Sequence, residues 1–150
     1  MEILYKYSVI AAGGAYTGLQ HSHYGLGYLL LVVALLNIAL SLSPSKNPQN
    51  FSKMMRLCHQ IYLFGGRSNL ILGISMVVMK PGWIPEQLTG MWWMVLPVLL
   101  WGGAEVVSKR LVKPQLQAIL EGLPSNRNLL IGFLVELIVL ALIFLCMIYR

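Results

Sequence analysis

The stretch that decides the fold is Tyr62-Leu-Phe-Gly-Gly-Arg67-Ser-Asn-Leu-Ile-Leu-Gly-Ile-Ser-Met-Val-Val-Met79, an apolar run with one permanent cation inside it. Without Arg67 it would be an ordinary membrane segment, because a bilayer core of about 30 Å needs about 20 mostly apolar helical residues. A charge within such a span is costly unless it is paired or faces a protein interior or an aqueous cavity. Arg67 therefore demands a partner, and that partner is the best indication of function in this chain.

The composition of the whole chain agrees with a membrane location. Its 150 residues are 57% hydrophobic and 11% charged, with a mean hydropathy of +0.71, which argues against a soluble globular protein. Four apolar stretches are long enough to cross a bilayer. The sequence predicts one integral membrane domain over residues 1–150: an all-α, up-down bundle of four transmembrane helices, with approximate spans 24–42, 55–79, 88–107 and 129–149.

Residues 1–20 precede the first predicted span. Their apolar stretch is short and leads into further membrane sequence, which is not the pattern of a signal peptide before a soluble domain. The segment is predicted to be an amino-terminal arm at the outer surface, either an amphipathic helix or a packed arm. A loosely ordered terminus is an equal alternative.

Basic residues set the predicted orientation. Seven lie on one side of the spans (Lys46, Lys53, Arg56, Lys109, Arg110, Lys113 and Arg127) and three on the other (Lys6, Lys80 and Arg150). The positive-inside rule then puts loops 43–54 and 108–128 in the cytoplasm and both termini in the periplasm of a bacterial inner membrane. The net charge of +6 is assigned to this topology and to anionic lipids at the cytoplasmic face. Nucleic-acid binding is not predicted, because the chain has no interleaved basic and aromatic groove.

Two carboxylates are candidate partners of Arg67. Glu136 lies about 10 Å below Leu129 and matches Arg67 better in depth. Glu105 lies nearer the inner interface, where Lys109 at i+4 is an alternative partner. The plain interpretation of this intramembrane polar group is an ion pair that fixes which helices are neighbours, and the functional one is a proton, quinone or anion site.

Glycines mark helix faces that allow close packing. Gly14 and Gly18 are four residues apart, a spacing that lets helices approach closely, and Gly102 and Gly103 are adjacent near the inner end of the third span. The predicted packing positions are Gly14, Gly18, Gly25, Gly65, Gly66, Gly102 and Gly103.

The chain offers no recognisable catalytic set and no metal motif. It lacks the Cys-x-x-Cys-His, His-Glu-x-x-His and phosphate-loop patterns, and it contains no Asp. His23 and His59 are weak candidates for a cofactor, but they sit near opposite faces of the membrane, whereas a bis-His haem needs both ligands at one depth. No cofactor is predicted, and haem or quinone is retained only as an alternative.

The segment His23-Tyr-Gly-Leu-Gly-Tyr-Leu-Leu-Leu31 resembles the opening helix of small four-span bacterial membrane proteins labelled cytochrome-b-like. Residues 70–73, Leu-Ile-Leu-Gly, and the Lys109-Arg110 exit are similar to that group as well. Where the group places second- and third-helix histidines, this chain has Arg67, Gly90 and Glu105. Because arginine is not a haem axial ligand in ordinary chemistry, the resemblance implies a retained scaffold without haem.

These observations favour a non-catalytic accessory or assembly subunit that packs against other integral membrane subunits. The expected host is an energy-transducing complex of the inner membrane, respiratory or photosynthetic, and thus part of electron transport. Two alternatives stay open: a b-type-cytochrome-like or quinone-site redox protein, and a small transporter or proton-conducting protein.

Overall fold

The computed structural model describes residues 2–42, 48–79, 92–123 and 127–148, and helices are the only regular elements of these residues. In chain order they are α1 (Glu2–Leu42), α2 (Pro48–Met79), α3 (Trp92–Val107), the π-helical segment η2 (Ser108–Val112), α4 (Lys113–Leu120) and α5 (Arg127–Ile148). The all-α prediction is confirmed. Three of the helices, over residues 13–42, 50–79 and 127–148, are long and apolar enough to cross a membrane.

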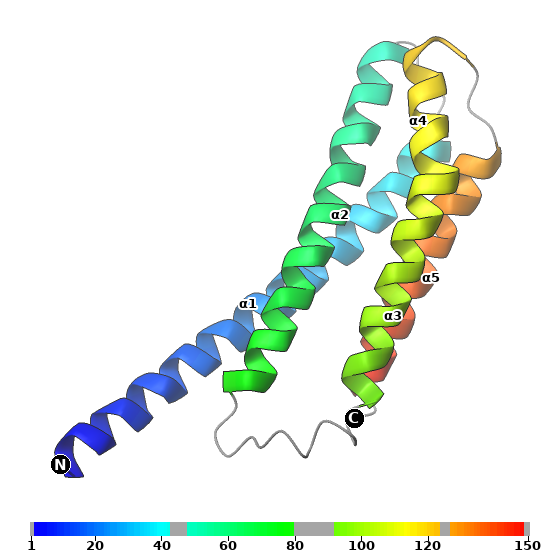
Figure 1. The fold of residues 1–150 in the computed structure, drawn as a ribbon. Helices are drawn as coiled ribbons and strands as arrows, with labels where there is room; N and C mark the ends of the chain where they lie inside the picture. Colours follow the sequence, from blue (N-terminus) through cyan, green and yellow to red (C-terminus); the bar gives the residue numbers. More distant parts are fainter. Residues whose placement is uncertain (1, 43–47, 80–91, 124–126, 149–150) are drawn as a thin grey trace.

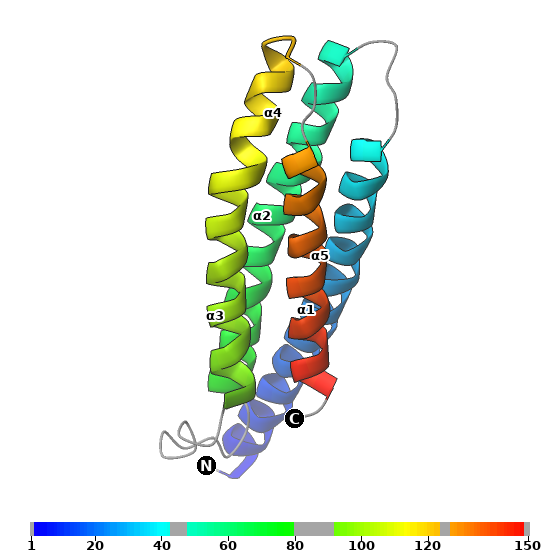
Figure 2. The same cartoon turned by 90° about the vertical axis from the view of Figure 1, so that its right-hand side faces the viewer.

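The helices form an elongated up-down bundle (Figures 1 and 2). The C-terminal ends of α1 and α4 and the N-terminal ends of α2 and α5 lie at the upper end of Figure 1. Going around the bundle, α1 lies between α2 and α5, and the rod formed by α3, η2 and α4 closes the ring between the same two helices. Helices α2 and α5 are therefore diagonal neighbours, and contacts between them cross the centre of the bundle.

The third helical rod is longer than predicted. Residues 108–120 were expected to belong to a cytoplasmic loop with one or two helical turns at 115–120, but α3, η2 and α4 form one uninterrupted helical rod from Trp92 to Leu120. The loop prediction is wrong for residues 108–114, whereas the helical turns expected at 115–120 lie within α4. The loop was predicted from the basic residues Lys109, Arg110 and Lys113. In the structure these residues are exposed on a helical rod that continues past them.

The π-helical segment keeps one face of this rod buried. Its buried residues recur at intervals of four, four, four and three along the rod: Ala104, Ser108, Val112, Leu116 and Ile119. In an undistorted α-helix each interval of four drifts about 40° around the axis. The wider turn, in which the backbone N–H of Lys113 donates to the carbonyl of Ser108 five residues earlier, absorbs this drift. It also lies directly before Pro114, which has no N–H to donate.

Helix α1 runs without a break through the boundary expected at residue 20. Residues 2–20 of the predicted arm are thus the first part of α1, and the first turns of α1 project past the lower ends of α2 and α3 (Figures 1 and 2). The helix ends at Leu42 and Met79 agree with the predicted spans, whereas α2 begins at Pro48, seven residues before its predicted start.

Two apolar clusters fill the bundle. The upper cluster, at the end where α4 finishes, consists of Leu40, Met55, Val112, Leu116, Ile119, Leu129 and Phe133. The lower cluster consists of Leu30, Val33, Ala34, Tyr62, Trp101, Leu140 and Ile143. Both clusters draw on all four rods, so each is a cross-section of the bundle.

The outside of the bundle is apolar as well. Large aliphatic and aromatic side chains stand exposed on all four rods, among them Val32, Phe64, Ile71, Leu99 and Ile138. A soluble bundle would carry polar side chains at such positions. An outer surface of this kind suits the hydrocarbon of a bilayer, in agreement with the length and apolarity of α1, α2 and α5.

Candidate functional site

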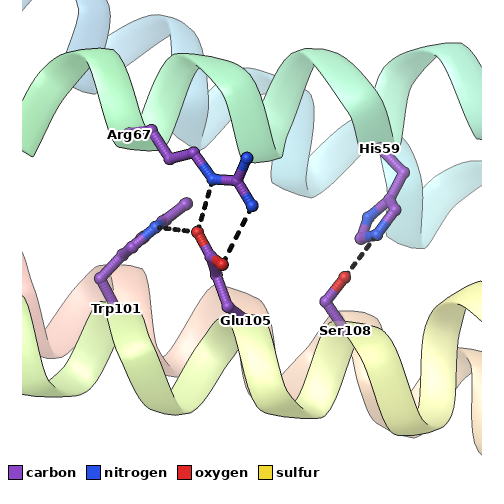
Figure 3. A network of polar contacts seen from close by, with 5 residues as sticks. All are labelled: His59, Arg67, Trp101, Glu105 and Ser108. Carbon is purple, nitrogen blue, oxygen red and sulfur yellow. Dashed lines mark hydrogen bonds and ion pairs between the residues drawn. The ribbon is translucent and has the colours of Figure 1, made fainter.

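Arg67 forms a bidentate ion pair with Glu105 across the α2–α3 contact (Figure 3). Its Nε donates to Oε1 of Glu105 at 2.7 Å, and its Nη2 donates to Oε2 at 3.0 Å. The indole N–H of Trp101, one turn before Glu105, donates to the same Oε1 at 3.2 Å. Planar fork-to-carboxylate pairing of this kind fixes the orientation of both groups.

The depth argument that favoured Glu136 as the partner of Arg67 is wrong. It counted both residues from the same membrane face, but Arg67 lies about 12 Å beyond His59 along α2, whereas Glu136 lies beside His59 in the centre of the bundle. The alternative partner for Glu105, Lys109, makes no ion pair with it. Arg67, Glu105 and Glu136 therefore belong to two sites, of which one is exposed and one is buried.

The Arg67–Glu105 pair lies on the surface of the bundle. The side chains of Arg67 and Glu105 are 56% and 21% exposed. A guanidinium has five N–H donors, and Glu105 takes two of them. The other three have no partner among the residues described.

The predicted packing glycines divide into two groups. A Cβ added at Gly65 would lie 2.9 Å from Leu30 of α1, and one added at Gly66 would collide with the Trp101 ring, so both glycines make close helix contacts within the bundle. Gly14, Gly18, Gly25, Gly102 and Gly103 have open space beside them in the described part of the chain. Gly132, which the sequence did not single out, packs against Val112, 2.5 Å from its would-be Cβ.

A second polar group lies in the centre of the bundle, between the two apolar clusters. Each rod contributes one side chain to it, and all four side chains are buried: Asn37, His59, Ser108 and Glu136. On its own rod, each of these residues lies between a residue of the lower cluster and a residue of the upper cluster, as Asn37 lies between Ala34 and Leu40. The four residues are therefore at a similar height in the bundle. We name these four residues the polar layer.

His59 is the hub of the polar layer. Its Nε2 lies 2.7 Å from the hydroxyl of Ser108, and its Nδ1 lies 3.5 Å from Oε2 of Glu136. The ring stacks on Tyr62, with ring centroids 6.4 Å apart, and the Tyr62 hydroxyl donates to the backbone carbonyl of Glu136 at 3.1 Å. The imidazole thus connects a hydroxyl on the third rod to a carboxyl group on the diagonally opposite helix.

Part of the polar layer has no hydrogen-bond partner within the described residues. Both polar side-chain atoms of Asn37, which is 0% exposed, are unpaired, and so are Oε1 of Glu136 and Nδ1 of His59, whose contact with Oε2 of Glu136 is an ion-pair distance and not a formed hydrogen bond. Buried polar atoms in native proteins are nearly always satisfied by protein, water or an ion. These atoms therefore each have the capacity for a further hydrogen bond.

His23 and His59 lie at different levels of the bundle. His23 of α1 is buried against α2, where its Nδ1 lies 3.1 Å from the carbonyl oxygen of Asn69. Asn69 follows His59 by ten residues, which corresponds to about 15 Å along the helix. A bis-His site within one chain is therefore excluded for this pair, as the sequence indicated.

Sequence reasoning missed Asn37, Ser108, Tyr62 and Trp101. A lone asparagine within the run Leu29–Leu42 was the available indication for Asn37, because polar residues inside membrane spans face protein more often than lipid. Ser108 had no such indication, because it follows the end of the third predicted span. No protein-family model matches the chain, and no curated protein or solved structure does. The resemblance to the cytochrome-b-like group stays a prediction.

Proposed function

We propose that the chain is a four-span membrane protein with both termini on the outer side. The third crossing is the rod from Trp92 to Leu120, which lies beside α2 and α5. The basic residues Lys53, Arg56, Lys109, Arg110, Lys113 and Arg127 are exposed in the upper part of the bundle, which supports a cytoplasmic upper end in contact with anionic lipids.

Within this topology we propose that the protein is an accessory or assembly subunit of a larger inner-membrane complex. The observation that carries the proposal is the exposed Arg67–Glu105 pair, with three N–H donors of Arg67 directed to no described residue. Charged groups on the outside of a membrane bundle are costly against lipid and stable against protein. The pair is therefore assigned to an interface.

The surface around the pair suits a helix. On α2, Phe64, Arg67 and Ile71 follow one another at helical spacing, and on α3, Val98, Gly102 and Glu105 do the same. All of them but Glu105, which is half-buried, are exposed, and Gly102 has open space beside it. We name these six residues the α2–α3 face. Its occupant is proposed to be one transmembrane helix of another protein, with a hydrogen-bond acceptor opposite Arg67.

The test is purification of the tagged chain from its native membrane in mild detergent, with quantitative mass spectrometry. The wild-type chain is compared with Arg67→Leu/Glu105→Leu, which removes both charges together, and with Arg56→Leu. Arg56 is an exposed arginine on the same helix, in the basic upper part of the bundle, and serves as the matched control. Energy-transducing complexes, respiratory or photosynthetic, are the first systems to examine.

The proposal expects a stoichiometric partner with wild type and Arg56→Leu, and its loss with the double variant, while all three chains melt at similar temperatures. Recovery of the chain alone or as a homo-oligomer would contradict it. Equal recovery of the partner with the double variant would show that the α2–α3 face is not the interface. Loss of bound anionic lipid as the only change would assign Arg67 to a lipid headgroup.

A further inference from the structure

The net charge of the polar layer depends on the protonation of His59 and Glu136, which the proposed interface does not involve. His59 is 4% exposed and Glu136 is 1% exposed, and both lie between two apolar clusters in the centre of the bundle. A carboxylate beside a neutral imidazole would leave a net negative charge there, at a depth where a lone charge is costly. A carboxylic acid beside an imidazolium would leave a net positive charge.

Among the described residues, no other charged side chain forms an ion pair with the polar layer. On the third rod the nearest charged residues are Glu105, which pairs with Arg67, and Lys109 and Arg110, which are exposed. On α2 the ionisable neighbours are Tyr62, whose hydroxyl donates to a backbone carbonyl, and the thiol Cys58, which packs against both apolar clusters. Helix α1 presents the neutral Asn37, and the only charged side chains of α5 within its described residues are Arg127, exposed at its start, and Glu136 itself.

Two arrangements of His59 and Glu136 are neutral, and they differ by the position of one proton. Either the imidazolium faces the carboxylate, or the proton has moved from Nδ1 of His59 to Oε2 of Glu136, leaving a neutral ring and a carboxylic acid. The atoms that would exchange it lie 3.5 Å apart, so a small side-chain movement brings them into hydrogen-bond range. Ser108, at 2.7 Å from Nε2, accepts the Nε2–H bond in both arrangements, because the proton that moves is the one on Nδ1.

A buried water molecule is the simplest partner for the unpaired atoms of the layer. Oε1 of Glu136 and the amide of Asn37 are buried, lie at one level and lack partners in the described part of the chain. A buried water molecule needs two to four polar partners of this kind. We propose that the polar layer is a proton-binding site in which His59 and Glu136 together hold one proton, exchanged with solvent through a water molecule at Asn37.

The first test counts protons in the wild-type chain in lipid nanodiscs at neutral pH. Nitrogen-15 NMR of labelled histidine reports the state of His59, assigned with His59→Gln, and infrared difference spectroscopy reports whether Glu136 is acid or carboxylate, assigned with Glu136→Gln. Glu105→Gln is the matched control on the exposed carboxylate. Because the chain has five Glu and no Asp residues, the carboxyl region of the spectrum is simple.

One proton in the pair, as imidazolium with carboxylate or as neutral ring with carboxylic acid, is the expected result. A neutral ring beside a carboxylate, or an imidazolium beside a carboxylic acid, would overturn the proposal. If a variant does not fold, carbon-13 labelling of Glu in wild type replaces it. The route is tested with Asn37→Leu, which should slow hydrogen–deuterium exchange of the shared proton at least tenfold. Unchanged exchange would refute the role of Asn37.

Discussion

Gly66 is the residue of α2 that accommodates the Trp101 ring of α3. The Trp101 ring occupies the place of a side chain at this position, and the ring nitrogen of Trp101 in turn donates to Glu105. The contact therefore positions the carboxylate that binds Arg67. At this scale the site depends on two neighbouring glycines, since Gly65 on the preceding position admits Leu30 of α1.

Replacing Gly66 by Ala should destabilise the fold. The new methyl group meets a rigid ring that is 4% exposed, and overpacking of this kind typically costs about 1–3 kcal/mol. Gly103→Ala, with open space beside it and the better helix propensity of alanine, should be neutral or stabilising. Thermal unfolding of both variants in the same detergent is the measurement, and equal melting temperatures would show that Trp101 moves away without cost.

The identity of the residues did not reveal which carboxylate pairs with Arg67. Depth counted from a predicted helix end carries an error of several residues, and α2 begins at Pro48, seven residues before the predicted start. That error is enough to change which of the two carboxylates is assigned to the level of Arg67. The need of Arg67 for a carboxylate followed from physical chemistry, and the choice between two carboxylates depended on helix register, which only packing determines.

At the scale of elements, η2 is the irregular part of the bundle. It holds Ser108 against His59 and Val112 against Gly132, so that the polar layer and the upper cluster meet within one turn. The sequence could not indicate it, because the run Lys109–Pro114 has the charge and the proline of a loop. The sequence did not indicate that a π-helical turn leaves these charged side chains exposed on the surface of the bundle while the rod continues.

Removing the extra residue of the π turn should be tolerated. Deletion of the exposed Arg110 changes the buried spacing along the rod to four, three, four and three, which is the pattern of a regular helix. The deletion is made together with Pro114→Ala, because proline inside an α-helix costs about 3 kcal/mol. This variant should melt close to Pro114→Ala alone.

The control is deletion of the exposed Gln60 from α2, which rotates the residues that follow by about 100° and separates His59 from Tyr62. It should abolish folding, measured as the monodisperse fraction in size-exclusion chromatography. If both deletions cause a similar loss of folded protein, the bundle requires the extra residue of the π turn.

At the scale of the whole molecule, the apolar stretches predicted helices whose described ends at Leu42, Met79 and Ile148 agree closely with the predicted spans, whereas the third rod continues past its predicted end to Leu120. Hydrophobicity is sufficient to predict these helix ends because the sequence changes from apolar to polar within a few residues. Neighbour relations were not predictable, since four similar apolar helices pack in several orders. The ring order depends on Gly65, Gly66 and Gly132, whose partners on other helices the sequence does not name.

The four-span topology predicts that Met79 and Gln117 lie on opposite sides of the membrane. Both are exposed, at the lower end of α2 and on α4 near the upper end. In a background with Cys58 and Cys146 changed to Ser, Met79→Cys should react with a membrane-impermeant maleimide in intact spheroplasts. Gln117→Cys should react only after permeabilisation. Reaction of both in intact spheroplasts would show that the third rod does not cross.

The central feature of the proposed function is that another protein covers the α2–α3 face in the membrane. Phe64 on this face is 74% exposed, and Tyr28 on α1, at 65%, is an exposed aromatic residue on another rod. Each is replaced in turn by the photoreactive amino acid p-benzoylphenylalanine, and native membranes are illuminated. We predict one discrete crosslinked partner from position 64 and none of it from position 28. Lipid adducts alone at position 64, or the same products from both positions, would contradict the account.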